Sequence, residues 1–253
     1  MKIVKIVASF VLILSILALA VWAGIRANDQ TCTGISIVIH APENPELLSK
    51  SDISNILKQQ HTKWEGEKIK EIDLAAIHKI LAQENYIKSV DKVHFSGSNL
   101  QIEVTLHDIL LEVNAATGEK FLLDVNGAYL PYSPKVGNDV IVATGSIPYS
   151  FRKKETITSE NSELYQLFTV ASLIKQDPFY AGWFKEIHLS DKQGIILLSP
   201  EDKLPVLLGA AQDAESKLKT LKYMYVEVLP YMNEGKYAQL DVRFKSRIVA
   251  KKN

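Results

Sequence analysis

The sequence predicts an α+β fold with one N-terminal transmembrane helix, a β-α-α-β-β domain and a mixed β-domain that contains two helices. Three observations lead to this prediction. An uncharged apolar run occupies residues 6–25. Two segments with helical apolar spacing then lie between segments in which apolar and polar residues alternate. The remainder is richer in short strand-like segments separated by turn residues.

The N-terminal run is long enough to cross a membrane. As a helix, residues 6–25 rise about 30 Å, which matches the hydrocarbon core of a bilayer. Lys2 and Lys5 precede the run and Asp29 follows it, so the positive-inside rule places residues 1–5 in the cytoplasm. We therefore expect a single-pass anchor with the bulk of the chain on the periplasmic side.

A cleaved signal peptide is the alternative interpretation of the same run. Ala18-Leu19-Ala20 and Val21-Trp22-Ala23 both resemble the small-residue sites at which signal peptides are cut. The run is longer than a typical signal core of about 7–15 residues, which favours a retained anchor. Either interpretation sends residues 27–253 across the membrane.

Composition excludes several classes of function. Lys plus Arg and Asp plus Glu both number 29, so there is no overall positive charge to attract a nucleic acid. Cys32 is the single cysteine of the chain, which rules out an intramolecular disulfide and a cysteine-rich metal site. The exported part must therefore be stabilised by its hydrophobic cores.

The first exported domain is predicted at residues 33–107. Ser49 and Asp52 have the spacing of a helix capping box, and Asp73 stands directly before an apolar helical stripe. Gly97-Ser98-Asn99 is a turn between two alternating segments, which indicates a β-hairpin. The expected elements are a strand at 35–39, a helix that follows the cap at Ser49 and runs to about Gln60, a helix over 74–81, and strands at 88–95 and 100–106.

The second domain is predicted at residues 108–250. Asn126-Gly127 is a strong turn dipeptide, and Pro178 ends a helical apolar pattern. The expected strands are 120–125, 140–143, 187–189, 195–198, 205–208 and a terminal strand at 237–249, and the expected helices are 164–174 and 214–228. A strand added last by a chain terminus often lies at the edge of a sheet, so we expect an exposed edge there.

No catalytic, cofactor-binding or metal-binding residues are predicted. The six histidines include no pair at helical metal-ligand spacing, although His94 and His107 could approach across the hairpin. The glycine-containing segments Ser96-Gly97-Ser98 and Thr144-Gly145-Ser146 match neither a nucleophile elbow nor a phosphate-binding loop. The sequence therefore favours a binding protein over an enzyme.

An aromatic cluster follows Pro178. Phe179, Tyr180, Trp183 and Phe184 either pack in the core of the second domain or form a platform for a sugar or a peptide. Core packing is the favoured interpretation, because aromatic side chains bury large apolar areas in small cores.

Three segments, in this order and spacing, resemble the bacterial cell-division family FtsQ/DivIB. They are LAAIHKILAQENYIKSVDKVHF, KFLLDVNGAYLP and GKYAQLDVRF. The resemblance covers nearly the whole chain. It implies that residues 33–107 form a POTRA-like domain and that residues 108–250 form an FtsQ-like β-domain.

The resemblance also implies a function and a site. It implies a non-enzymatic divisome scaffold of the inner membrane that is enriched at the septum and binds FtsB- and FtsL-type partners. A partner strand would pair with an edge near the C-terminal end of the β-domain. The residues implied in partner binding are Tyr237, Leu240, Asp241, Val242, Arg243 and Phe244. The substitution Val242→Pro is then expected to abolish the pairing.

Two other functions remain open at this point. POTRA-like units also occur in envelope assembly and transport factors, although the two helices predicted in the second domain argue against a barrel-forming protein. An exported enzyme whose site the sequence does not reveal is the other alternative.

Overall fold

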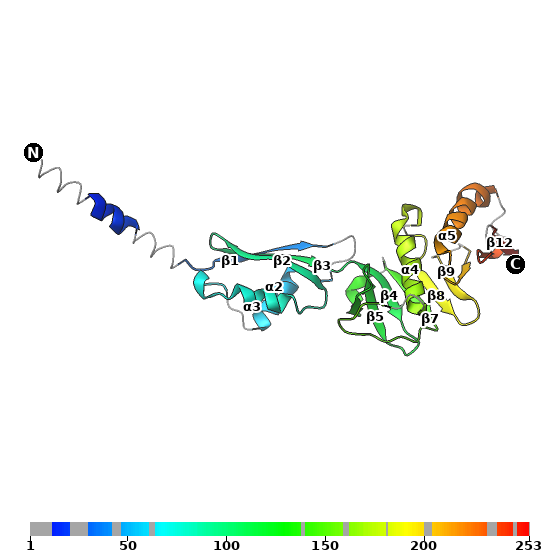
Figure 1. Ribbon diagram of the computed structural model, residues 1–253, viewed down its shortest axis with the longest axis horizontal. Coiled ribbons are helices and arrows are strands. Elements are labelled where there is room, and N and C mark those ends of the chain that lie inside the picture. The colour runs from blue at the N-terminus through cyan, green and yellow to red at the C-terminus, as the bar shows by residue number, and fades with distance from the viewer. Residues whose placement is uncertain are drawn as a thin grey trace, which may run out of the picture. The chain divides into compact units, whose positions relative to one another are not determined.

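The structure is a computed structural model. It describes residues 12–20, 30–41, 47–60, 64–137, 140–158, 162–180, 182–199, 204–231, 237–244 and 247–252. Contacts divide the chain into two compact units, with a boundary between Leu106 and His107. Figure 1 shows the elements of both units along the chain. Each unit has its own hydrophobic core.

Residues 12–20 are helical, and their leucine and isoleucine side chains are exposed. In the described part of the chain, no helix has both the length and the apolar character that a membrane span requires. The predicted tail at residues 1–5 and most of the predicted span at 6–25 lie outside the described residues.

The first unit is a three-stranded sheet covered by two helices. Its strands run in the order β1-β3-β2, with β1 parallel and β2 antiparallel to the central β3. The element order confirms the predicted β-α-α-β-β arrangement. The bounds are β1 Gly34–His40, α2 Lys50–Gln59, α3 Leu74–Leu81, β2 Ile87–Ser96 and β3 Asn99–Leu106, with a short 3₁₀ turn at Ile69–Glu71.

Local sequence signals fix both helices of this unit. The side chains of Ser49 and Asp52 form the predicted capping box at the start of α2. The Asp73 carboxylate caps α3 by accepting a hydrogen bond from the Ala76 amide. Apolar residues of both helices then pack on alternate residues of β3, which are Leu100, Ile102, Val104 and Leu106.

The second unit contains a mixed sheet that, in the described chain, runs in the order β12-β11-β10-β9-β8-β7-β4-β5-β6. Its strands are β4 Ile109–Asn114, β5 Lys120–Asp124, β6 Tyr129–Pro131, β7 Ile141–Gly145, β8 Glu186–Ser190, β9 Gly194–Leu198, β10 Val206–Gly209, β11 Tyr237–Asp241 and β12 Val249–Lys252. Its helices are α4 Glu163–Gln176 and α5 Ala214–Tyr223, and a π-helical turn at Met224–Val228 extends α5.

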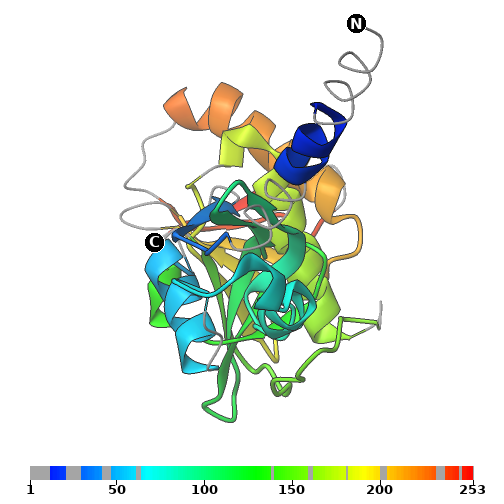
Figure 2. The ribbon, with the colours of Figure 1, turned by 90° about the vertical axis from the view of Figure 1, so that its left-hand side faces the viewer.

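Both helices are crossovers between parallel strands. The α4 helix joins β7 to β8, and α5 joins β10 to β11; each of these strand pairs is parallel. Parallel neighbours need such a crossover because the chain must return to the same end of the sheet. Figures 1 and 2 show α4 in yellow-green and α5 in orange beside this sheet. The apolar residues of both helices and alternate strand residues form one core cluster.

Two predictions for the second unit were incomplete or wrong. Strand β4 lies between β5 and β7, but its run Ile109–Asn114 begins only two residues after β3 and does not alternate, so no strand was predicted there. The predicted terminal strand at 237–249 is confirmed over residues 237–241 and wrong as one continuous strand. The chain leaves β11 after Asp241 and begins a separate strand, β12, at Val249.

Candidate partner-binding site

The expected edge strand is an interior strand. On one side of β11, the Leu240 amide donates to the Pro205 carbonyl oxygen (2.9 Å) and the Val242 amide donates to the Leu207 carbonyl oxygen (3.0 Å). On the other side, β11 pairs with β12 in antiparallel register. The prediction that residues near 237–242 offer an unpaired backbone edge is therefore wrong. Strand β12 lies alongside β11 and covers that edge.

The six residues implied by the family resemblance differ in exposure. Leu240 and Val242 are buried and belong to the core cluster. Tyr237 and Asp241 are partly buried. Arg243 is exposed, and 42% of the Phe244 surface is exposed. Of these side chains, Arg243 and Phe244 are therefore the most accessible to another molecule.

Strand β12 forms the outer edge of the described sheet on this side. The amides of Leu240 and Val242 point to β10. Because backbone groups of successive residues point to opposite sides of a strand, the N–H and C=O groups of Asp241 point to β12, where Asp241 pairs with Val249. Consequently the backbone N–H and C=O groups of Ala250, the next residue after Val249, point away from β11. Another strand could hydrogen-bond to this edge.

A cluster of basic and aromatic side chains lies at the turn between β11 and β12. Arg243 Nη2 donates to Asp241 Oδ2 (2.7 Å), and Arg243 Nε donates to Asp241 Oδ1 (3.0 Å). The guanidinium carbons of Arg243 and Arg247 lie 6.0 Å and 5.0 Å from the centre of the Phe244 ring. This arrangement presents an aromatic ring beside two positive charges.

Two opposing effects act on the carboxyl group of Asp241. Burial raises its pKa, but the hydrogen bonds and positive charge of Arg243 outweigh this effect, and the pKa lies below its ordinary value. The same hydrogen bonds raise the pKa of Arg243. Asp241 is therefore a carboxylate at neutral pH, and it holds the Arg243 side chain in place at the turn.

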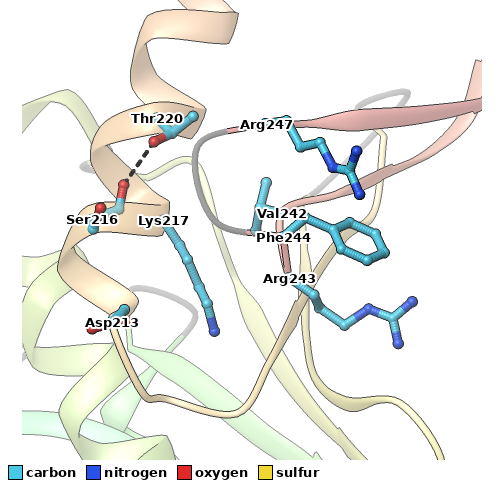
Figure 3. A pocket seen from close by; sticks show the side chains of 8 residues that line it. All are labelled: Asp213, Ser216, Lys217, Thr220, Val242, Arg243, Phe244 and Arg247. Atoms are coloured by element: carbon cyan, nitrogen blue, oxygen red, sulfur yellow. Dashed lines mark hydrogen bonds between the residues drawn. The ribbon is translucent and has the colours of Figure 1, made fainter.

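A small cavity of about 40 Å³ lies between the residues that follow β11 and helix α5. Figure 3 shows the side chains that line it. Val242, Arg243, Phe244 and Arg247 line it from the turn, and Asp213, Ser216, Lys217 and Thr220 line it from the helix. Lys217 Nζ donates to the carbonyl oxygens of Leu208 (3.1 Å) and Ala210 (2.7 Å). The lysine thus binds the C-terminal end of β10. The polar side of α5 forms one wall of the cavity.

Sequence reasoning missed Arg247 and the residues of β12. In the structure, Ile248, Val249, Ala250 and Lys251 alternate between partly buried and exposed positions. Their residue types, three apolar residues followed by a lysine, do not alternate in the sequence. The predicted strand ended at residue 249 because the preceding alternation in 239–245 was treated as continuous with it.

The remaining candidates from the sequence lie elsewhere. His94 pairs with Gln101 near the hairpin turn, whereas the His107 ring nitrogen Nδ1 lies 2.8 Å from Asp124 Oδ2 in the second unit. The expectation that the two histidines could approach each other is therefore wrong. Within the described ranges, no group of three or more His, Cys, Asp or Glu side chains is arranged to hold a metal ion.

The aromatic cluster is part of the second core, as predicted. Tyr180 and Phe184 are buried, and the Tyr180 hydroxyl donates to the Leu218 carbonyl oxygen (2.6 Å). Trp183 stacks on Phe179 at 4.9 Å and meets Tyr225 edge-on at 4.4 Å between ring centres. Burial raises the pKa of Tyr225 to about 12. These contacts join the end of α4 to α5 and its π-helical extension.

Comparison with known families gives two matches, which together cover most of the chain. Residues 109–251 match the family model described as FtsQ/DivIB, C-terminal related. Residues 30–105 match a POTRA-like domain. No curated protein matches the chain.

Proposed function

The chain belongs to the FtsQ/DivIB family, and we propose that it is a non-enzymatic scaffold of the bacterial division machinery that holds FtsB- and FtsL-type partners at the septum. The family supports a scaffold role in cell division. The match over residues 109–251 favours this function over an envelope assembly factor, because it covers the mixed β-domain and not the POTRA-like domain alone.

The observation that carries the proposed mechanism is the outer edge of β12. This strand ends the described sheet, and the backbone of Ala250 points outward from it. A partner that adds a strand here gains backbone hydrogen bonds without displacing any described strand. Arg243 and Phe244, two of the six residues implied in partner binding, lie at the turn that precedes this edge. Tyr237, Leu240 and Asp241 belong to the adjoining strand β11, which pairs with β12, and Val242 directly follows that strand.

A proline in the edge strand tests the pairing. Ala250→Pro removes an amide that points to solvent, so the fold should tolerate it, whereas a partner strand loses a hydrogen bond and meets the proline ring. The full chain in detergent is co-expressed with an FtsB-type protein, and the co-purified amount is measured. We expect a decrease of at least about tenfold, equivalent to about 1.4 kcal/mol.

Ala250→Ser is the matched control, because it keeps the amide and should keep the partner. Thermal unfolding of both variants shows whether the domain is intact. Full co-purification of an FtsB-type protein with a well-folded Ala250→Pro variant would contradict pairing at β12.

Location gives an independent test of the scaffold role. We propose an inner-membrane protein with a cytoplasmic N-terminus and a periplasmic bulk, in agreement with the charge pattern around residues 6–25. A fluorescent fusion should concentrate at mid-cell during constriction. An even distribution around the envelope would contradict a division role, and a mature N-terminus near Val21 or Gly24 would contradict the anchor.

A further inference from the structure

The outer face of α5 and of its π-helical extension exposes large apolar side chains. Tyr223 is 64% exposed, Val226 is 49% exposed, and Tyr231, in the short 3₁₀ turn that follows, is 87% exposed. The inner face packs on the sheet, because Leu218 and Leu221 belong to the core cluster. In Figures 1 and 2 the helix α5, drawn in orange, lies on the outside of the second unit. Exposed tyrosines on one face are typical of a surface that another protein covers.

Two charged side chains lie on the same face. Lys219 is four positions before Tyr223 and Glu227 is four positions after it, and residues four apart share a helix face. Lys219 and Glu227 are both exposed. Among the described residues, none forms a hydrogen bond or an ion pair with either of these two side chains. We call Lys219, Tyr223, Val226, Glu227 and Tyr231 the α5 stripe.

The charges of the α5 stripe complement those of a second copy. When two identical helices pack antiparallel about a two-fold axis, the residue on the axis faces its own copy, and positions equally far before and after it face each other. With the axis at Tyr223, Lys219 of each copy faces Glu227 of the other. Glu215, which is also exposed, then faces Tyr231, whose hydroxyl is a hydrogen-bond donor for the carboxylate. Both apolar stripes are covered in the same contact.

The charges also exclude other registers and another kind of occupant. An axis at Lys219 or at Glu227 sets each of these charges against its own copy, which is repulsive. A membrane surface is disfavoured as well, because membrane-surface helices carry Lys and Arg on the polar face that borders the apolar one. Here Glu215 and Glu227 lie beside the exposed tyrosines.

We propose that the α5 stripe is a self-association surface, at which two copies of the chain pack their α5 helices antiparallel about Tyr223. Tyr223 and Val226 supply the apolar contact, and the two symmetry-related Lys219–Glu227 pairs fix its register. This proposal goes beyond the function proposed above, because it concerns a different face of the second unit from the β12 edge and holds whether or not a partner strand binds there.

Charge reversal tests the register. Lys219→Glu and Glu227→Lys each set like charges against each other in a dimer, so each variant should self-associate at least about tenfold more weakly than the wild type. The full chain in detergent is measured by sedimentation velocity over a concentration series. An equimolar mixture of the two variants restores opposite charges at both positions and should form a heterodimer.

The mixture also shows that both variants are folded, since it recovers the association that each lacks alone. Lys192→Glu, in the exposed turn between β8 and β9, is the control and should leave self-association unchanged. A wild type that stays monomeric at every concentration, or a mixture that associates no better than the separate variants, would overturn the proposal.

An introduced cysteine tests the position of the axis. Cys32 is buried, so Tyr223→Cys supplies the accessible thiol of the variant. A residue on the axis lies beside its own copy, within the range that a disulfide spans. Mild oxidation should therefore link most of the Tyr223→Cys chains into dimers and few of the Lys192→Cys chains. Equal yields for the two variants would contradict an axis at Tyr223.

The variant Ala250→Pro separates this proposal from the proposed function. It alters the β12 edge and should leave self-association unchanged. Loss of the dimer in Ala250→Pro would show that the copies meet through β12 and would overturn the assignment to α5. Loss of the FtsB-type protein with an unchanged dimer would support both proposals.

Discussion

At the scale of single residues, Asp124 is the one charged residue that is buried among those the structure describes, with 1% of its surface exposed. Its carboxylate accepts hydrogen bonds from the amides of Asn126 (2.9 Å) and Ala128 (2.8 Å) and lies 2.8 Å from His107 Nδ1. It therefore organises the turn between β5 and β6 and fixes His107, which directly follows Leu106, the last residue of β3. A buried carboxylate with these partners stabilises the fold only while it is ionised.

The stability contributed by Asp124 should depend on pH. Burial raises its pKa, but the hydrogen bonds from His107, Ala128 and Asn126 together lower it further, so the pKa in the folded protein lies below the unfolded value. Its contribution is therefore present above the unfolded pKa and is lost as the pH falls through the folded one.

We expect Asp124→Asn to lower the local unfolding free energy by about 2 kcal/mol at pH 7. The difference from the wild type should shrink below about pH 4. Hydrogen exchange of the β5 amides, corrected for the intrinsic rate at each pH, measures both effects. Asp91→Asn is the control, because Asp91 bonds Ser89 and Thr105 on the exposed surface of the first unit. A pH-independent difference would show that charge is not the cause.

At the scale of elements, the interior position of β11 changes the expected effect of Val242→Pro from loss of partner binding to loss of stability. The Val242 amide donates to the Leu207 carbonyl oxygen within the sheet. Val242→Pro therefore breaks the pairing of β11 with β10 and should destabilise the second unit by about 3 kcal/mol. Ala250→Pro, on the outer side of β12, should leave thermal unfolding nearly unchanged. Equal melting temperatures for these two variants would contradict the strand order described above.

The aromatic cluster links helices α4 and α5. Trp183 contacts both Phe179 and Tyr225, and these three rings pack against the core. We expect Trp183→Ala to lower the unfolding free energy of the second unit by about 3 kcal/mol or more, measured by denaturant unfolding. A stable, well-folded variant with a partner-binding defect would instead support a binding platform.

At the scale of the whole molecule, the two units have separate hydrophobic cores. Separate cores predict that a cavity in one unit is felt mainly in that unit. Leu57 of α2 and Leu221 of α5 are both fully buried, so Leu57→Ala and Leu221→Ala form a matched pair. Each should cost about 2–5 kcal/mol, and hydrogen exchange should locate the loss in the first unit and the second unit respectively. Losses spread over both units in either variant would indicate one cooperative fold.

The sequence was sufficient for features that depend on neighbouring residues. The capping box at Ser49 and the cap at Asp73 act over three positions, and the structure contains both. Alternation along Leu100–Leu106 correctly identified the buried face of β3. The order of these local patterns was also enough to recognise the FtsQ/DivIB family.

Only the tertiary structure decided which strands are neighbours. Alternation assigns a side chain to a face of the sheet, but it carries no information about the strand on either side, because pairing joins residues that are distant in the chain. Leu240 pairs with Val206 and with Ala250, and neither contact can be deduced from the spacing of residues. The sequence by itself determined that the C-terminal region forms a strand. Only the tertiary structure shows that β12, and not β11, is the edge strand of the described sheet.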